Sequence, residues 1–271
     1  MTQQLDPTIS FYARDITPPH PQQSVSIFQS ASKLSPSSSW ILYIHGGAWR
    51  DPREDKQMGY PLLEHVLPAH WSGASIDYRL SPTVQHPTHM DDVILAIQHL
   101  VTEYGMENMI LVGHSAGACI ALQILAELTA LKLTSRMADD RQSNDDYLSD
   151  KIKAVVAVEG IYDLKDLVCE YPGYRDFVCM AFGADELEWE DASPSSFNWS
   201  QLKNGSGAKI TLIQSAQDEL LSMRQTTLMK QALDKAEWTS EIKFIDGGSH
   251  NSTVESVPFY NIVAQVCKNL S

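Results

Sequence analysis

The chain alternates short apolar runs with longer stretches whose apolar residues recur at helical spacing. Six runs are predicted to form strands: WILYIH (40–45), WSGASIDYRL (71–80), MILVG (109–113), IKAVVAVEG (152–160), KITLIQSA (209–216) and EIKFID (241–246). Helices are predicted between them and after the last one, at about 56–67, 89–103, 116–130, 222–236 and 256–269. Buried strands that alternate with helices form a mostly parallel sheet with helices on both faces, so the sequence predicts an α/β fold.

The regular pattern is interrupted in three places. Residues 1–38 are polar and rich in proline and serine, and are predicted to form an N-terminal arm or an opening hairpin. Residues 39–271 are predicted to be a single domain with two insertions, at about 131–150 and 164–205. In the first, the stretch 134–150 is charged and indicates a solvated surface segment. In the second, residues 164–202 are rich in aromatic and acidic side chains and are expected to form irregular helical cap material.

Composition excludes several classes of function. The formal net charge of −14 disfavours nucleic acid or an anionic membrane surface as a partner. The N-terminal residues show no signal-peptide pattern, and no apolar run is expected to approach the roughly 20 residues of a membrane span. The four cysteines have no metal-ligand spacing. We therefore expect a cytoplasmic protein without a metal and with a small-molecule substrate; a homodimer is compatible with the sequence, which does not decide the oligomeric state.

Ser115 lies in the sequence GHSAG, between an apolar strand and a helical stretch. A serine flanked in this way by Gly113 and Gly117 can be presented as a nucleophile on a tight strand-to-helix turn. The same pattern also arises by chance in ordinary turns. A serine hydroxyl is a poor nucleophile at neutral pH, so the hypothesis requires a base, an acid and an oxyanion hole elsewhere in the chain.

An acid and a base follow Ser115 in the order nucleophile, acid, base, which is one of the orders that serine hydrolases use. Asp218 comes just after the strand 209–216, and His250 follows the strand 241–246. No other histidine lies C-terminal to Asp218. Because the carboxyl ends of parallel strands share one edge of the sheet, we predict Ser115 as nucleophile, His250 as base and Asp218 as the acid that orients it.

Three other carboxylates compete for the role of the acid. Glu159 ends the strand 152–160 and Asp163 follows it, so both come one strand earlier than the usual position. Asp163 also fits the N-cap of a helix that begins at Leu164. Glu219 neighbours Asp218 and is the more serious rival, but we expect its side chain to point into the following helix.

The segment IHGGAW (44–49) fits an oxyanion hole. A tetrahedral oxyanion needs backbone N–H groups aimed at one point, and glycines let the chain turn back without a Cβ in the way. The expected donors are the amides of Gly47, Ala48 and Ala116, with Gly46 as a less favoured further one. His45 is expected to hold the loop by hydrogen bonding rather than to act as a base.

The motifs HGGAW (45–49), DYRLSP (77–82), GHSAGA (113–118) and EGIYDL (159–164) together resemble the hormone-sensitive-lipase-like branch of α/β hydrolases. More narrowly, the chain resembles the fungal kynurenine formamidases, because it carries HGGxW where esterases of the branch usually carry HGGG. The segments CEYPGYRDFVCMAFG (169–183) and DELLSMRQT (218–226) add to this likeness. The resemblance covers about residues 38–270 and implies the α/β-hydrolase fold, with a mostly parallel central sheet, helices on both faces and a small cap.

The resemblance implies hydrolysis of N-formyl-L-kynurenine to L-kynurenine and formate through a formyl-serine intermediate, in tryptophan catabolism towards NAD and without a cofactor. Trp49, Tyr162, Tyr171 and Tyr174 are candidate substrate contacts, with packing inside the protein as their alternative role. Arg224 or Arg79 is a candidate cation for the anionic substrate. Two alternatives remain open: a small-acyl carboxylesterase of the same branch, and a non-catalytic receptor or interaction protein with a hydrolase fold.

Overall fold

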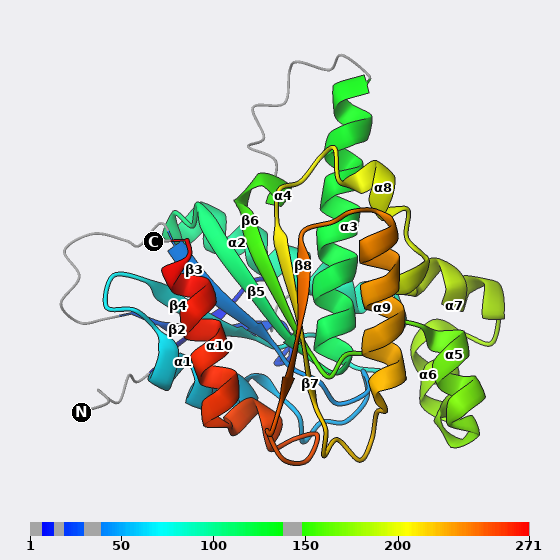
Figure 1. The fold of residues 1–271 in the computed structure, drawn as a ribbon. Helices are drawn as coiled ribbons and strands as arrows, with labels where there is room; N and C mark the ends of the chain where they lie inside the picture. The colour runs from blue at the N-terminus through cyan, green and yellow to red at the C-terminus, as the bar shows by residue number, and fades with distance from the viewer. Residues whose placement is uncertain (1–6, 14–18, 30–38, 138–147, 271) are drawn as a thin grey trace.

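The computed structural model describes residues 7–13, 19–29, 39–137 and 148–270 (Figure 1). Its centre is an eight-stranded sheet with the strand order β1-β2-β4-β3-β5-β6-β7-β8. The first two strands pair antiparallel, as do β2 and β4, and all other neighbours are parallel. The predicted mostly parallel α/β sheet is therefore confirmed. The strands are β1 (Thr8–Phe11), β2 (Ser24–Phe28), β3 (Ser39–Ile44), β4 (Ser72–Ile76), β5 (Asn108–His114), β6 (Ile152–Val158), β7 (Lys209–Ser215) and β8 (Ser240–Ile245).

Helices cover both faces of the sheet (Figure 1). On one face pack α2 (Thr88–Tyr104), α3 (Ala116–Met137) and α9 (Met223–Lys235), and on the other α1 (Tyr60–Val66) and α10 (Val257–Lys268). Strand β3 shows why two layers form. Trp40 and Leu42 point into the first apolar cluster, whereas Ile41 and Tyr43 point into the second. Alternate residues of a strand face opposite sides, so a strand that is apolar throughout needs a cover on both faces.

The connections place the ends of the parallel strands at one edge of the sheet. The chain leaves β3 for β4 on one side and returns to β5 on the other, so β3 and β5 are neighbours at the point where the strand order reverses. In open α/β sheets the crevice outside the carboxyl ends of such strands is the usual ligand site. The loops after β3, β5, β6, β7 and β8 all lie at this edge.

Some element boundaries differ from the predicted ones. The helix expected at 56–67 is split into η1 (Lys56–Gly59) and α1. The strand predicted at 71–80 ends at Ile76, because Asp77 accepts a hydrogen bond from the backbone of Lys56 at 2.7 Å and Arg79 pairs with Asp92 at 2.8 Å. These polar contacts hold residues 77–82 outside the sheet.

The helix α3 is longer than the predicted span of 116–130 and corrects one expectation about membranes. The segment Ala116–Ser135 is long and apolar enough to cross a membrane by length and composition, contrary to the expectation that no apolar run approaches that length. In the fold, 78% of its apolar window is buried. Its length and apolarity are explained by its place in the core, against β5 and β6.

The cap (residues 164–202) consists of short helices beside the carboxyl edge of the sheet: α5 (Leu164–Glu170), η2 (Pro172–Tyr174), α6 (Arg175–Phe182), α7 (Glu186–Ala192), η3 (Pro194–Ser196) and α8 (Trp199–Leu202). Side chains from several of these helices, among them Phe177, Trp189 and Trp199, join the same apolar cluster as α3. The predicted insertion at about 131–150 begins within α3 and ends in α4 (Leu148–Lys151), and its residues 138–147 lie outside the described ranges.

Candidate active site

Ser115 lies on the turn between β5 and α3, at the carboxyl edge of the sheet. Its φ is 54°, a left-handed conformation that is costly for a residue with a side chain. The strain is held by packing and by a hydrogen bond of 2.8 Å from the Ser115 N–H to the carbonyl of Val158 in β6. Backbone strain of this kind is characteristic of functional sites.

The two glycines of the GHSAG motif are required by close backbone approach. A Cβ on Gly113 would lie 2.3 Å from the carbonyl oxygen of Gly117, and a Cβ on Gly117 would lie 2.2 Å from that of Ile44. Helix α3 therefore begins in direct contact with the end of β3. This contact fixes the distance between Ser115 and the loop that follows β3.

His250 and Asp218 are brought together from the loops after β8 and β7. Nδ1 of His250 donates to Oδ2 of Asp218 at 2.9 Å. Asp218 also accepts from the backbone N–H groups of Leu220 and Leu221, each at 2.9 Å. Burial alone would raise the pKa of Asp218, but these hydrogen bonds and the nearby imidazole hold its pKa below the ordinary value. The arrangement leaves Nε2 of His250 as the nitrogen available to a hydroxyl.

Ser115 and His250 line the same cavity. Among the described residues, no hydrogen bond joins the Ser115 hydroxyl to the imidazole. Contacts between nucleophile and base are often long in hydrolases without bound substrate, and they shorten in the complex. The geometry therefore supports a nucleophile–base pair without showing the bond between them.

The HGGAW loop (residues 45–49) turns towards Ser115. Gly47, Ala48 and Trp49 have φ values of 88°, 48° and 57°, so three consecutive residues are left-handed. Within the described part of the chain, the N–H groups of Gly47 and Ala48 donate no hydrogen bond, and both residues line the cavity beside Ser115. Ala116 is the first residue of α3, where backbone N–H groups have no partner within the helix. These are the donors that an oxyanion hole needs.

The other predicted residues of the loop support it from behind. His45 is buried, its Nδ1 lies 3.0 Å from the carbonyl of Gly46, and its ring stacks on Tyr78 at a centroid distance of 4.3 Å. The Tyr78 hydroxyl donates to the carbonyls of His45 and Gly46, at 3.0 Å each. Gly46 packs closely against Ser115, since a Cβ added to Gly46 would lie 3.1 Å from the Ser115 Cβ.

The cavity has a volume of about 450 Å³ and two unlike walls. The apolar wall includes Ile161, Tyr174, Phe177 and Leu221. The polar wall is lined by Arg50, Asp51, Arg53, Glu54 and Asn251, and it meets the apolar wall where Arg50 lies over the ring of Phe177. A ligand with an aromatic part and a charged part fits such a site.

The structure separates the substrate contacts that the sequence suggested. Tyr174 lines the cavity, and Tyr171 stacks on it at 5.0 Å. Trp49 and Tyr162 are buried and do not line the cavity; Trp49 packs edge-on against Phe182. At these two positions the structure favours the alternative role, packing inside the protein, because both side chains are buried away from the cavity.

The two candidate cations are also corrected. Arg224 is exposed and bonded to Asp166 at 2.5 Å, and Arg79 is paired with the buried Asp92 at 2.8 Å; neither lines the cavity. Arg50, which sequence reasoning did not single out, lines the cavity, lies over the ring of Phe177 at 5.6 Å and pairs with the exposed Asp176. Its position directly after the HGGAW loop could have indicated this place, because Gly47 and Ala48 of that loop line the same cavity.

The rival acids have other partners. Asp163 caps α5 by accepting from the Asp166 N–H at 2.9 Å, as predicted. Glu219 does not point into the next helix; it accepts from the backbone N–H of His250 at 3.0 Å. Glu159 is fully buried near the imidazole of His250.

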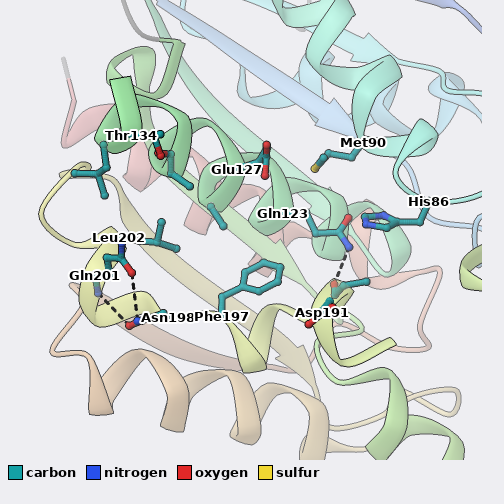
Figure 2. Close-up of a pocket in the computed structure, with 14 residues that line it drawn as sticks. His86, Met90, Gln123, Glu127, Thr134, Asp191, Phe197, Asn198, Gln201 and Leu202 are labelled. Atoms are coloured by element: carbon teal, nitrogen blue, oxygen red, sulfur yellow. Dashed lines mark hydrogen bonds between the residues drawn. The ribbon is translucent and has the colours of Figure 1, made fainter. Parts of the chain in front are cut away.

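A second cavity, of about 330 Å³, lies between α3 and the cap (Figure 2). Figure 2 shows that the Gln123 amide, which donates to the carbonyl of Ala192 at 2.8 Å, points towards His86. Burial lowers the pKa of His86 to about 4, so this imidazole is neutral at physiological pH. The lining residues of this cavity, all of them described, contain no hydroxyl or thiol bonded to a base, whereas Ser115 and His250 both line the cavity described above.

Comparison with known proteins agrees with this geometry. The family model described as BD-FAE matches residues 26–233. A kynurenine formamidase of Meyerozyma guilliermondii is 43% identical over 194 residues, which cover 71% of this chain and 70% of the relative. One of Saccharomyces cerevisiae is 34% identical, with 80% of this chain and 84% of the relative covered.

Solved structures show the same fold at low identity. The crystal structure of esterase B from Lactobacillus rhamnosis superposes with a TM-score of 0.75 at 15% identity, covering 97% of this chain and 85% of that chain. At this identity the likeness concerns the fold alone. The family follows from the sequence matches, which extend over more than two thirds of both chains. This chain thus belongs to the BD-FAE family and to the kynurenine formamidases.

Proposed function

We propose that this enzyme hydrolyses N-formyl-L-kynurenine to L-kynurenine and formate, a step of tryptophan catabolism towards NAD. The observation that carries the proposal is the 2.9 Å hydrogen bond from His250 to Asp218, beside a cavity that Ser115 also lines. Membership of the kynurenine formamidase family supplies the substrate. The reaction requires no cofactor, because an activated serine and water are sufficient for it.

The first half of the reaction transfers the formyl group to the enzyme. The Ser115 hydroxyl attacks the formyl carbon while Nε2 of His250 takes its proton, and Asp218 stabilises the imidazolium that forms. The amides of Gly47, Ala48 and Ala116 donate to the developing oxyanion. Collapse of the tetrahedral intermediate breaks the bond between carbon and nitrogen, and His250 returns the proton to the aniline nitrogen that leaves.

The second half regenerates the serine. A water molecule gives its proton to His250 and attacks the formyl carbon of the ester, and the protonated His250 returns a proton to the serine oxygen. Formate leaves. The leaving group of the first half is favourable, because the aromatic ring delocalises the nitrogen lone pair and weakens the amide resonance.

The two walls of the cavity suggest how the substrate lies. With the formyl group at Ser115, the aromatic ring would contact the apolar wall at Tyr174 and Phe177. The amino-acid end would face the polar wall, where Arg50 would accept its carboxylate as a counter-ion. The α-carboxylate of the zwitterionic substrate would thus meet a local cation on a protein of net charge −14.

Steady-state assays with matched substrates test the proposal. The wild type is expected to hydrolyse N-formyl-L-kynurenine with a much higher kcat/KM than p-nitrophenyl acetate, and Ser115→Ala is expected to lose both activities. Efficient cleavage of the acetyl ester, with N-formyl-L-kynurenine turned over no faster than by Ser115→Ala, would instead identify a small-acyl carboxylesterase. Absence of a fluorophosphonate adduct at Ser115 would identify a non-catalytic receptor.

A charge-specific experiment tests the orientation of the substrate. A hydrogen bond between charged groups contributes about 1.5–3 kcal/mol. Arg50 is partly exposed and shares its charge with Asp176, so we take the lower value, which is about a tenfold change in affinity. Arg50→Met should raise KM for N-formyl-L-kynurenine about tenfold and leave KM for the uncharged N-formylaniline unchanged. Arg224→Met, which removes an equal charge outside the cavity, is the control; equal effects of the two variants would refute this orientation.

We also propose that the enzyme works in the cytoplasm. None of the four cysteines, all of which the structure describes, is in a disulfide, and two of them, Cys119 and Cys267, are buried, which suits a reducing compartment. Fractionation of cells that express the tagged chain tests this location. The homodimer stays a prediction, and sedimentation of the purified protein measures its oligomeric state.

A further inference from the structure

The buried carboxyl group of Glu159 has one oxygen without a hydrogen-bond partner. Glu159 follows β6, and its Oε1 accepts from the Ser215 N–H at 3.1 Å and from the Thr253 hydroxyl at 3.0 Å. Its Oε2 accepts nothing from the described residues. This atom lies 3.6 Å from Nδ1 of His250 and 3.7 Å from Nε2 of His114. A buried polar atom without a partner is costly, and such an atom beside a catalytic group indicates a role.

The backbone fixes Glu159 in this position. Its φ is 47°, which is unfavourable for a residue with a side chain, and its N–H donates to the carbonyl of Ile213 in β7 at 2.8 Å. The side chain is fully buried and is hydrogen-bonded by two segments, at Ser215 and at Thr253. The carboxyl therefore cannot turn to solvent without breaking both hydrogen bonds of Oε1.

The imidazole of His250 thus faces two carboxyl groups in unlike environments. Asp218 accepts four hydrogen bonds, from His250, Gln214 and two backbone amides, and its pKa is held low. Burial, and then the charge of Asp218, raises the pKa of Glu159 to about 8. At neutral pH, Asp218 is the anion and Glu159 is a neutral acid. Paired carboxyl groups with separated pKa values are a common arrangement in active sites.

The other titratable groups around Glu159 do not supply a stronger partner. His114 donates from Nε2 to the carbonyl of His250 at 3.1 Å, and burial lowers its pKa to about 3, so it is neutral. Glu219 is occupied by the backbone N–H of His250. The ligand atoms of His114, Glu159 and His250 lie within 4.8 Å of one another, as in a metal site, but both histidines already use the nitrogens in question as hydrogen-bond donors.

We propose that Glu159 is a second carboxyl partner of the His250 imidazole, which takes over from Asp218 as acceptor of the Nδ1 proton when Asp218 is missing. The inference rests on the proposed serine-hydrolase function. In the wild type Asp218 prevails, because it lies at 2.9 Å against 3.6 Å for Glu159. An approach of about 0.7 Å, the difference between these two distances, gives Glu159 a normal hydrogen bond. Without the charge of Asp218 beside it, Glu159 also ionises more readily.

A double-mutant cycle measured across pH tests the proposal. Loss of the acid in a triad lowers kcat by about 10⁴-fold. We expect Asp218→Ala to lose less than this at high pH, and its kcat to rise at least tenfold, roughly, from pH 6 to pH 9 as Glu159 ionises. Glu159→Gln in the Asp218→Ala background should remove this rise. The same substitution should cost at least about tenfold more there than in the wild-type background, because only there is Glu159 the sole acid beside the imidazole.

Two further variants separate this role from a structural one. Asp218→Ala/Glu219→Gln removes a neighbouring carboxylate that contacts only the backbone of His250, and should keep the rise with pH. If Glu159→Gln does not fold, as judged by thermal unfolding, Glu159→Asp keeps the acid but shortens its reach by one methylene group, and should also remove the rise.

The outcomes distinguish this inference from the proposed function. Equal kcat values of Asp218→Ala and Asp218→Ala/Glu159→Gln at every pH, in folded proteins, would overturn the inference. The proposed function would still stand if the wild type hydrolyses N-formyl-L-kynurenine and Ser115→Ala does not. If the wild type cleaves only acetyl esters, the same cycle is measured with p-nitrophenyl acetate, and the role of Glu159 is decided independently of the substrate.

Discussion

Gly117→Ala is expected to slow catalysis by separating the nucleophile from the oxyanion hole. The added Cβ would lie 2.2 Å from the carbonyl oxygen of Ile44 and 2.5 Å from that of His45. A carbon–oxygen contact requires about 3.3 Å, so helix α3 and the end of β3 must move apart by about 1 Å. A misplacement of about 1 Å in an active site lowers the rate about 100-fold. We therefore expect kcat for N-formyl-L-kynurenine to fall about 100-fold, with a smaller effect on KM because Tyr174 and Phe177 of the apolar wall come from the cap.

The assay follows kynurenine formation by absorbance, together with thermal unfolding. Overpacking of this kind costs about 1–3 kcal/mol, so the melting temperature should fall by a few degrees to about ten degrees. Gly207→Ala is the matched control, because its Cβ would meet no atom within 4 Å and the residue lies outside the site. If Gly117→Ala folds and its kcat is within about threefold of the wild-type value, the close approach of Gly117 to the Ile44 carbonyl does not control the rate.

Three further substitutions test the packing and the charges. The pKa of Glu159 is raised to about 8 in the folded state, so its contribution to stability is complete below about pH 4.5 and is lost as pH rises through about 8. The loss is at most about 1.4 kcal/mol per pH unit. In thermal unfolding, Glu159→Gln should therefore lose less stability than the wild type between pH 6 and pH 9, and parallel curves would contradict this. Asp92→Ala leaves Arg79 without its buried partner and should lower the free energy of unfolding in urea by about 3–5 kcal/mol. A decrease below about 1 kcal/mol would show that water replaces the carboxylate. Trp49→Ala empties a buried site beside Phe177, so it should lower the free energy of unfolding by about 3–5 kcal/mol and raise KM. An unchanged unfolding midpoint would be inconsistent with the packing role of Trp49.

The sheet and the residues at its strand ends were largely predictable from sequence. Parallel strands end at one edge, so the order of Ser115, Asp218 and His250 along the chain was enough to predict that they meet. The walls of the cavity were not predictable in this way. Tyr162 and Tyr174 are both aromatic residues of the region after β6, but the first is buried in the core and the second lines the cavity. Only the packing of short helices decides between these positions, and short helices carry little periodicity.

Glu159 shows a second limit of sequence reasoning. Its place one strand before the usual acid argued against a role as the catalytic acid, and the hydrogen bond between Asp218 and His250 agrees with that argument. The sequence could not indicate that the left-handed backbone at Glu159 directs its carboxyl group back to the same imidazole. The closeness of the Glu159 carboxyl group to His250 depends on the φ angle of Glu159, and this angle cannot be recognised from residue type or spacing.

The division of labour between the strand-end loops and the cap has an evolutionary consequence. Ser115, His250 and the amides of the HGGAW loop lie at the sheet edge, whereas Gly173, Tyr174 and Phe177 come from one contiguous stretch of the cap. After a gene duplication, substitutions within about ten codons of the cap could therefore change the substrate while the residues at the sheet edge stay the same. A library randomised over 171–177 would sample new acyl-transfer specificities while every member kept the same reactive centre.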